Sequence, residues 1–179
     1  TLAQAAHDAG IGLTMLPVVY QRAGFAQPAL RDDQRRFACD LDLALRLRDA
    51  IRALKRPQVQ AGLAVHSLRA VPAATLHALH AATRSDAGPI HIHVAEQVSE
   101  VDDCLAHTGL RPVAWMAAQG LLDPRWSLVH ATHVLPDEID AVARQGAGVV
   151  LCPSTEANLG DGLTDVPRWL ASDTPLSIG

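Results

Sequence analysis

Residues 89–97 read PIHIHVAEQ, and this stretch decides how the rest of the chain is interpreted. From Ile90 to Val94, aliphatic residues alternate with histidines, which is the period of a β-strand. His91 and His93 therefore share one face of the predicted strand, and the aliphatic residues share the other. Glu96 follows where the strand would end. The stretch predicts a strand that packs through one face and presents chemical groups on the other, as an inward-facing barrel strand would.

The composition is that of a globular protein. Of the 179 residues, 49% are hydrophobic and 19% charged, and the formal net charge is −4. This is too apolar for a disordered chain, and no basic patch indicates binding to nucleic acid. No run approaches the ~20 apolar residues of a membrane span, and no signal peptide is visible. The three cysteines are scattered without a CxxC pair, so we expect a reducing, cytoplasmic compartment.

Strand and helix patterns alternate along the whole chain. Helices are predicted at 1–9, 35–55, 72–84, 97–107, 112–119, 136–145 and 164–171, and residues 153–162 are predicted to be a polar loop. Six strands are predicted, at 11–18, 59–65, 90–94, 126–130, 148–152 and 175–178. No hairpin signal separates any two strands, so the alternation favours a parallel sheet.

The candidate chemical residues gather at the C-terminal ends of four predicted strands. They are His66, His93 with Glu96, His130, and the segment 152–158. Active residues gathered at these ends are typical of a (β/α)₈ barrel. Both chain ends look interrupted, so we expect an incomplete barrel: one partial domain over residues 1–179, without the first strands and the end of strand eight.

Each candidate residue has a structural alternative. His93 with Glu96 fits a metal ligand beside a proton-carrying carboxylate, or else a core histidine beside a helix N-terminal acid. His91 is interpreted as a structural, hydrogen-bonded histidine; the rival interpretation makes it one half of a two-histidine metal pair with His93. His130 is either a ligand or a general base, and His133 in the following loop is structural or solvent-facing.

The remaining candidates concern substrate binding and nucleophilic chemistry. His66 and Arg69 are placed on the loop after a strand, where an arginine fork can hold a carboxylate; the alternative is an arginine paired with a neighbouring acid. Cys152 is interpreted as a small buried residue rather than a nucleophile, because no activating base is evident. Asp161, among glycines, is assigned to turn formation.

Three segments together resemble one family. Residues 91–97, 128–133 and 151–162, the last reading LCPSTEANLGDG, resemble the amidohydrolase superfamily, most closely the N-formimino-L-glutamate deiminases of histidine degradation. Residues 66–70 and 100–105 are also similar to that family. The resemblance implies a (β/α)₈ barrel with a small β-sandwich built from the chain ends, and one divalent metal, usually zinc and in some cases iron. It further implies a possible homodimer.

The resemblance also implies a role for each site residue. His93 matches the metal ligand on the fifth strand, and Glu96 the carboxylate that contacts the reacting imine and shuttles protons. His130 matches the sixth-strand histidine that acts as base or stabilises the attacking hydroxide. His66 and Arg69 match substrate-binding positions. The family's other ligands, a first-strand HxH pair and an eighth-strand Asp, have no match here, so we expect these 179 residues alone to bind metal weakly or not at all and to be inactive.

The implied reaction is metal-dependent hydrolysis of N-formimino-L-glutamate to N-formyl-L-glutamate and ammonia, on a small substrate that carries carboxylates. The alternatives are another deaminase or a chlorohydrolase of the superfamily, acting on a purine or triazine, and a non-catalytic barrel remnant. The chain has only three Trp, one Tyr and two Phe, none beside the matched residues in the sequence. Stacking on a flat heterocycle is therefore less favoured than an acidic aliphatic substrate.

Overall fold

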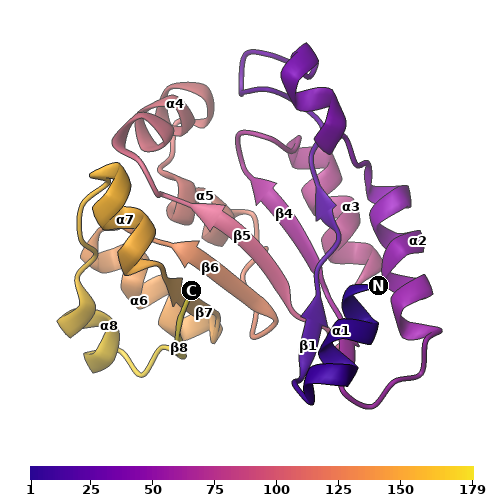
Figure 1. Cartoon of the computed structure of the whole chain (residues 1–179). Coiled ribbons are helices and arrows are strands. Elements are labelled where there is room, and N and C mark those ends of the chain that lie inside the picture. The colour runs from indigo at the N-terminus through magenta and orange to yellow at the C-terminus, as the bar shows by residue number, and fades with distance from the viewer.

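The computed structural model describes all residues from 1 to 179 and alternates strands with helices (Figure 1). The strands are β1 (Leu13–Met15), β2 (Val18–Val19), β3 (Val59–Ala61), β4 (Leu63–Ser67), β5 (Ile90–Val94), β6 (Trp126–His130), β7 (Gly148–Leu151) and β8 (Leu176–Ile178). The helices are α1 (Leu2–Ala9), the 3₁₀ helix η1 (Asp32–Phe37), α2 (Leu41–Arg52), α3 (Ala73–Ala82), α4 (Val98–Thr108), α5 (Pro112–Ala118), α6 (Pro136–Gln145), α7 (Pro153–Leu159) and α8 (Val166–Ala171).

Six strands form one parallel sheet, as the alternation predicts. Their order across the sheet is β2-β4-β5-β6-β7-β8, and β1 pairs with β3 in a separate parallel pair. Within the larger sheet, strands that follow one another along the chain are neighbours. Strand β3, which comes between β2 and β4 in the sequence, lies outside this sheet. In Figure 1, α2 and α3 flank the sheet on one side of β4, and α6 and α8 lie beyond β7 at the other end. The C-terminal ends of β4 to β7 consequently meet at one edge of the sheet.

Two of the predicted strands are each divided in two. The strand predicted at 11–18 becomes β1 and β2, which are separated at Pro17, a residue without the N–H that a sheet ladder needs. The strand predicted at 59–65 divides at Gly62 into β3 and β4. A Cβ on Gly62 would overlap the carbonyl oxygen of Pro89. The glycine therefore lets the main chain at residue 62 approach Pro89 closely, where the pairing of β4 with β5 begins.

Two other predictions are wrong in part. The helix predicted at 35–55 begins only at Leu41, because the side chain of Asp40 caps it by accepting the Leu43 N–H at 2.7 Å. The stretch 153–162, predicted as loop, contains α7, with Pro153 in its first turn and Gly160 as a left-handed cap with φ of 73°. The first turn of α7 places Glu156 in the interior, where it is 3% exposed.

The hydrophobic core lies between the sheet and its helices. It includes Ile90, Ile92 and Val94, which are at most 1% exposed, so the apolar face predicted for residues 90–94 is confirmed. Burying each such side chain contributes about 1.5–3 kcal/mol. The opposite face of β5 carries His91 and His93, of which His93 is exposed. No helix of the structure has the length and apolar character that crossing a membrane requires.

Candidate active site

A hollow of about 300 Å³ lies at the C-terminal ends of β4, β5, β6 and β7. It contains all five residues that the sequence nominates. Its lining is His66, Ser67, Arg69, His93, Glu96, Glu100, Val129, His130, Cys152 and Thr155. Three imidazoles form a row: the ring centroids of His66 and His93 are 5.4 Å apart, and those of His93 and His130 are 5.6 Å apart.

The orientation of His93 leaves one ring nitrogen available to a metal. Its Nδ1 lies 2.8 Å from the main-chain carbonyl oxygen of His66. A carbonyl oxygen can only accept, so Nδ1 carries a proton, and in the neutral form of the ring Nε2 presents its lone pair. Histidines that bind metal are commonly held in this way by a second hydrogen bond. His93 Nε2 can therefore supply one ligand of a metal centre.

His66 lies within β4 rather than on the loop after it, which corrects the prediction. The register between β4 and β5 shifts between Val65 and Ser67, and such an irregularity re-aims the side chain within it. Burial, then the nearby His93 and Arg69, lower the pKa of His66 to about 4. The ring is therefore neutral near pH 7 and can exchange hydrogen bonds with a substrate.

Tyr20 packs on the ring of His66. The two centroids are 4.6 Å apart with the planes at 80°, in an edge-on contact. The sequence placed no aromatic residue beside the matched positions, so this neighbour corrects that expectation. The Tyr20 hydroxyl accepts a hydrogen bond from the Gln34 side chain at 2.9 Å, which fixes the ring in place.

Arg69 is half-buried, and its guanidinium has no hydrogen-bond acceptor or ion-pair partner in the structure. The alternative in which a neighbouring acid pairs with it is not observed. The residue stands on a turn closed by the Ala70 N–H, which donates to the carbonyl and the hydroxyl oxygens of Ser67 at 3.1 and 3.2 Å. An unpaired guanidinium at the rim of a polar hollow is suited to bind a carboxylate.

Glu96 is held by a residue whose role the sequence did not reveal. Glu96 follows Ala95, whose φ of 52° turns the chain sharply after β5. The buried carboxylate of Glu100, four residues further on, accepts the N–H groups of Ala95 and Glu96 at 3.1 and 3.0 Å. Burial nevertheless raises the pKa of Glu100. The Glu96 carboxylate itself is 22% exposed and lies 3.4 Å from His130 Nε2.

His130 occupies a strained turn. Its φ is 73° and that of Ala131 is 47°, and each such conformation costs about 1–3 kcal/mol in a residue other than glycine. The Ala131 N–H closes the turn by donating to the Val129 carbonyl at 3.2 Å. The turn is also fixed to the end of β5, because Ala131 N–H donates to the Val94 carbonyl at 3.1 Å and His133 N–H to the Ala95 carbonyl at 2.9 Å.

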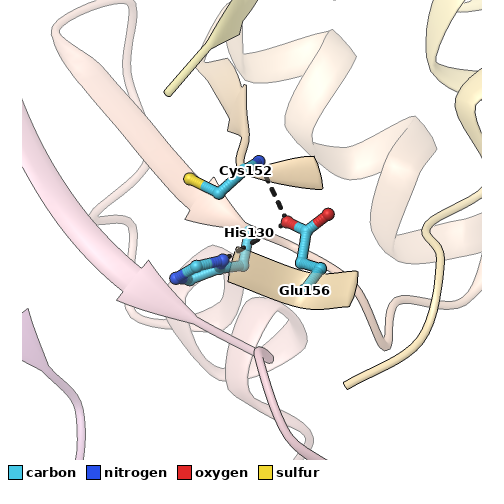
Figure 2. Close-up of side chains that lie close together, drawn as sticks. All are labelled: His130, Cys152 and Glu156. Atoms are coloured by element: carbon cyan, nitrogen blue, oxygen red, sulfur yellow. Dashed lines mark hydrogen bonds and ion pairs between the residues drawn. The ribbon is translucent and has the colours of Figure 1, made fainter. Parts of the chain in front are cut away.

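His130 is bracketed by two carboxylates. Its Nδ1 is 3.3 Å from Glu156 Oε1, on the side opposite Glu96. The same Glu156 oxygen accepts the Cys152 N–H at 3.0 Å, and Figure 2 shows the carboxylate facing that nitrogen with the sulfur on the far side. An ionised carboxylate can only accept, so the contact with Glu156 favours the tautomer with the proton on Nδ1 and leaves Nε2 facing Glu96.

The donor atoms of His130, Cys152 and Glu156 lie within 4.8 Å of one another and so form a possible metal site. Burial and the two nearby carboxylates raise the pKa of the Cys152 thiol, which disfavours the thiolate that a metal requires. The carboxylate is also already engaged by the two hydrogen bonds. Glu156 is therefore better explained as a residue that holds His130 in place than as a metal ligand. Cys152 is buried, as interpreted from the sequence.

Three secondary assignments are refined by the structure. His91 is half-buried with a pKa lowered by burial, but it makes no hydrogen bond, so the predicted hydrogen-bonded role is not observed. His133 is half-buried, and its Nε2 has no partner. Asp161 accepts a hydrogen bond from the Gln97 side chain at 3.1 Å, so it links the turn after β5 to the segment after α7.

The parallel sheet, with polar side chains gathered at the C-terminal edge of its strands, is the arrangement found in (β/α)₈ barrel enzymes. The chain belongs to the amidohydrolase family, whose family model matches residues 1–179. It is 47% identical over 179 residues to the formimidoylglutamate deiminase of Pseudomonas aeruginosa, covering 99% of this chain and 39% of that protein. The chain therefore spans about two-fifths of the length of this curated relative.

Solved structures agree with this family. An amidohydrolase from Brucella melitensis superposes with a TM-score of 0.92 at 42% identity, over 99% of this chain and 40% of that one. An adenosine deaminase from Xanthomonas campestris with bound zinc superposes with a TM-score of 0.81 at 26% identity, over 99% and 38% of the two chains. The predicted partial (β/α)₈ barrel is confirmed.

Proposed function

We propose that the whole protein hydrolyses N-formimino-L-glutamate to N-formyl-L-glutamate and ammonia, with residues 1–179 forming part of a single barrel domain. One observation carries the proposal. The unpaired guanidinium of Arg69 lines the same hollow as the proton-handling residues Glu96 and His130. The hollow thus combines a group that binds a carboxylate with groups that assist hydrolysis. The 47% identity to a formimidoylglutamate deiminase supports the same reaction.

In this mechanism Arg69 binds a substrate carboxylate, and His66, neutral at pH 7, adds a hydrogen bond. A divalent metal, zinc for preference, supplies an activated water when it is bound, and His93 Nε2 is the ligand that this chain contributes to it. The water oxygen adds to the formimino carbon while His130 Nε2 accepts the water's proton. Glu96 donates its proton to the imine nitrogen, then takes the proton of the newly added hydroxyl group and passes it to the same nitrogen. The C–N bond to that nitrogen breaks, releasing ammonia and leaving the formyl carbonyl, and His130 returns the water's proton to Glu96, 3.4 Å away.

Kinetics on the whole protein test these roles. Arg69→Met should mainly raise KM, because it removes binding that is present in both the ground state and the transition state. Glu96→Gln should mainly lower kcat, by about 10²–10⁴-fold, because it removes a proton carrier. Arg125→Met, at the opposite edge of the sheet, is the control and should leave both constants unchanged. Equal and mild effects of the Arg69 and Glu96 substitutions would contradict the assignment.

A second candidate is deamination of a purine, since a structural relative is an adenosine deaminase. Tyr20 supplies an aromatic ring that contacts His66, a residue that lines the hollow. Ammonia release from N-formimino-L-glutamate and from adenosine, assayed in parallel, separates the two. Turnover of adenosine alone would replace the first proposal.

A further inference from the structure

Arg22, on the loop after β2, is bound to the turn that carries Arg69. Its Nε donates to the Arg69 carbonyl at 2.9 Å, and its Nη2 donates to the Leu68 carbonyl at 2.9 Å. The N–H groups of Gln21 and Arg22 both donate to the Ala70 carbonyl at 3.0 Å. Three consecutive carbonyls of this turn are therefore held by two residues that lie more than 40 positions earlier in the chain.

The loop that carries Arg22 is fixed in turn to α4. The Arg22 guanidinium lies 5.4 Å from the centroid of the Phe25 ring, and Phe25 packs on His107 with centroids 5.2 Å apart. His107 is in the last turn of α4, the helix that begins two residues after Glu96. These contacts thus connect the turn that carries Arg69 to α4, the helix that follows Glu96.

We propose that Arg22 is a positioning residue that sets the location of the Arg69 guanidinium and so determines the affinity for the substrate carboxylate. This rests on the proposed function of Arg69. The Arg22 side chain holds the carbonyls of Leu68 and Arg69, and Leu68 is 3% exposed, so replacing the side chain leaves the buried Leu68 carbonyl without its donor. The turn is then free to move, because only the Ala70 carbonyl keeps its bonds to the main-chain N–H groups of Gln21 and Arg22. A shift of about 1 Å in a binding group can cost about 10²-fold.

The kinetic test uses the whole protein with N-formimino-L-glutamate. Arg22→Met should raise KM by about 10²-fold and change kcat by less than about threefold, because Arg69 contacts a carboxylate and not the reacting carbon. Arg22→Lys keeps the charge but lacks the fork that reaches two carbonyls, so its KM should lie between those of the wild type and Arg22→Met. Normal kinetics in Arg22→Met would overturn the proposal.

A double substitution separates positioning from general destabilisation. If Arg22 acts through Arg69, adding Arg22→Met to Arg69→Met should raise KM no further, whereas independent effects would multiply. Multiplied effects would overturn the proposal. Arg125→Met is the matched control: Arg125 is also half-buried and also donates to a main-chain carbonyl, that of Thr83, but it precedes β6 at the other edge of the sheet. It should lower thermal stability without changing KM.

A structural readout keeps the inference independent of the substrate assignment. If the whole protein does not act on N-formimino-L-glutamate, the proposed function fails, but a crystal structure of Arg22→Met still decides the role of Arg22. Displacement of the 68–70 turn supports the positioning role, and an unmoved turn overturns it.

Discussion

Replacing Glu156 with Gln tests whether the charge of the buried carboxylate supports His130 as a base. In the wild type, Glu156 Oε1 accepts from Cys152 N–H at 3.0 Å and from His130 Nδ1 at 3.3 Å. In Glu156→Gln the amide oxygen can take the place of Oε1 and face both nitrogens, so the proton can stay on Nδ1, but the negative charge beside the ring is lost. The imidazolium that forms when Nε2 takes a proton from water is then no longer stabilised by a facing carboxylate.

The expected loss follows from the contribution of a general base. Such a group accelerates a reaction by about 10²–10⁴-fold, which corresponds to about 3–5 kcal/mol in the activation free energy. Ammonia release by the whole protein at saturating substrate measures kcat directly. Because His130 does not contact the substrate carboxylate in this scheme, KM should change little.

The control is a second buried carboxylate outside the hollow. Glu138 is also 3% exposed, and it accepts hydrogen bonds from Arg111 and from the N–H groups of Ala114 and Leu135. Glu138→Gln should lower stability while leaving kcat near that of the wild type. If Glu156→Gln retains kcat within about threefold of the wild type, the supporting role assigned to the Glu156 charge is wrong.

Two further predictions concern stability. Burial raises the folded-state pKa of Glu100, so its contribution to stability is fully present below the unfolded pKa, ~4.3, and is lost as pH rises through the folded value. Urea unfolding between pH 4 and 8 should therefore show wild type losing stability relative to Glu100→Gln as pH increases, and a constant difference would contradict this. Gly62→Ala should lower the free energy of unfolding by about 1–3 kcal/mol, because the added methyl meets the Pro89 carbonyl and Leu16. Gly12→Ala, with no atom within 4 Å of the added Cβ, is the control and should be near neutral, and equal effects would count against the close-approach argument.

The sequence predicted the strands that have a clear period. Residues 90–94 and 126–130 are strands with the predicted bounds, because alternating or aliphatic side chains report a buried face directly. The placement of candidate residues at strand ends also brought His66, Arg69, His93, Glu96 and His130 to one hollow. Parallel strands make this inference robust, since all their C-terminal ends meet at one edge.

The residues that hold the site in place could not be predicted from the sequence, for physical reasons. Glu156 was placed in a loop, and only the first turn of α7 directs its carboxylate to His130; Pro153 and Gly160 were the available signals for that helix. Arg22 acts on a turn more than 40 residues later, and no local pattern encodes such a contact. The bonds of Glu100 to Ala95 and Glu96 require the left-handed conformation of Ala95, which propensities for alanine do not suggest.

The two main-chain hydrogen bonds between the ends of β5 and β6 have a consequence for motion. Ala131 and His133 donate to Val94 and Ala95, so the two turns form one mechanically continuous unit. Glu96 and His130 cannot drift apart without breaking both bonds, and the amides of Ala131 and His133 should therefore exchange slowly with deuterium. In the proposed mechanism, the two proton-transfer groups therefore keep a fixed spacing whatever moves elsewhere around the hollow.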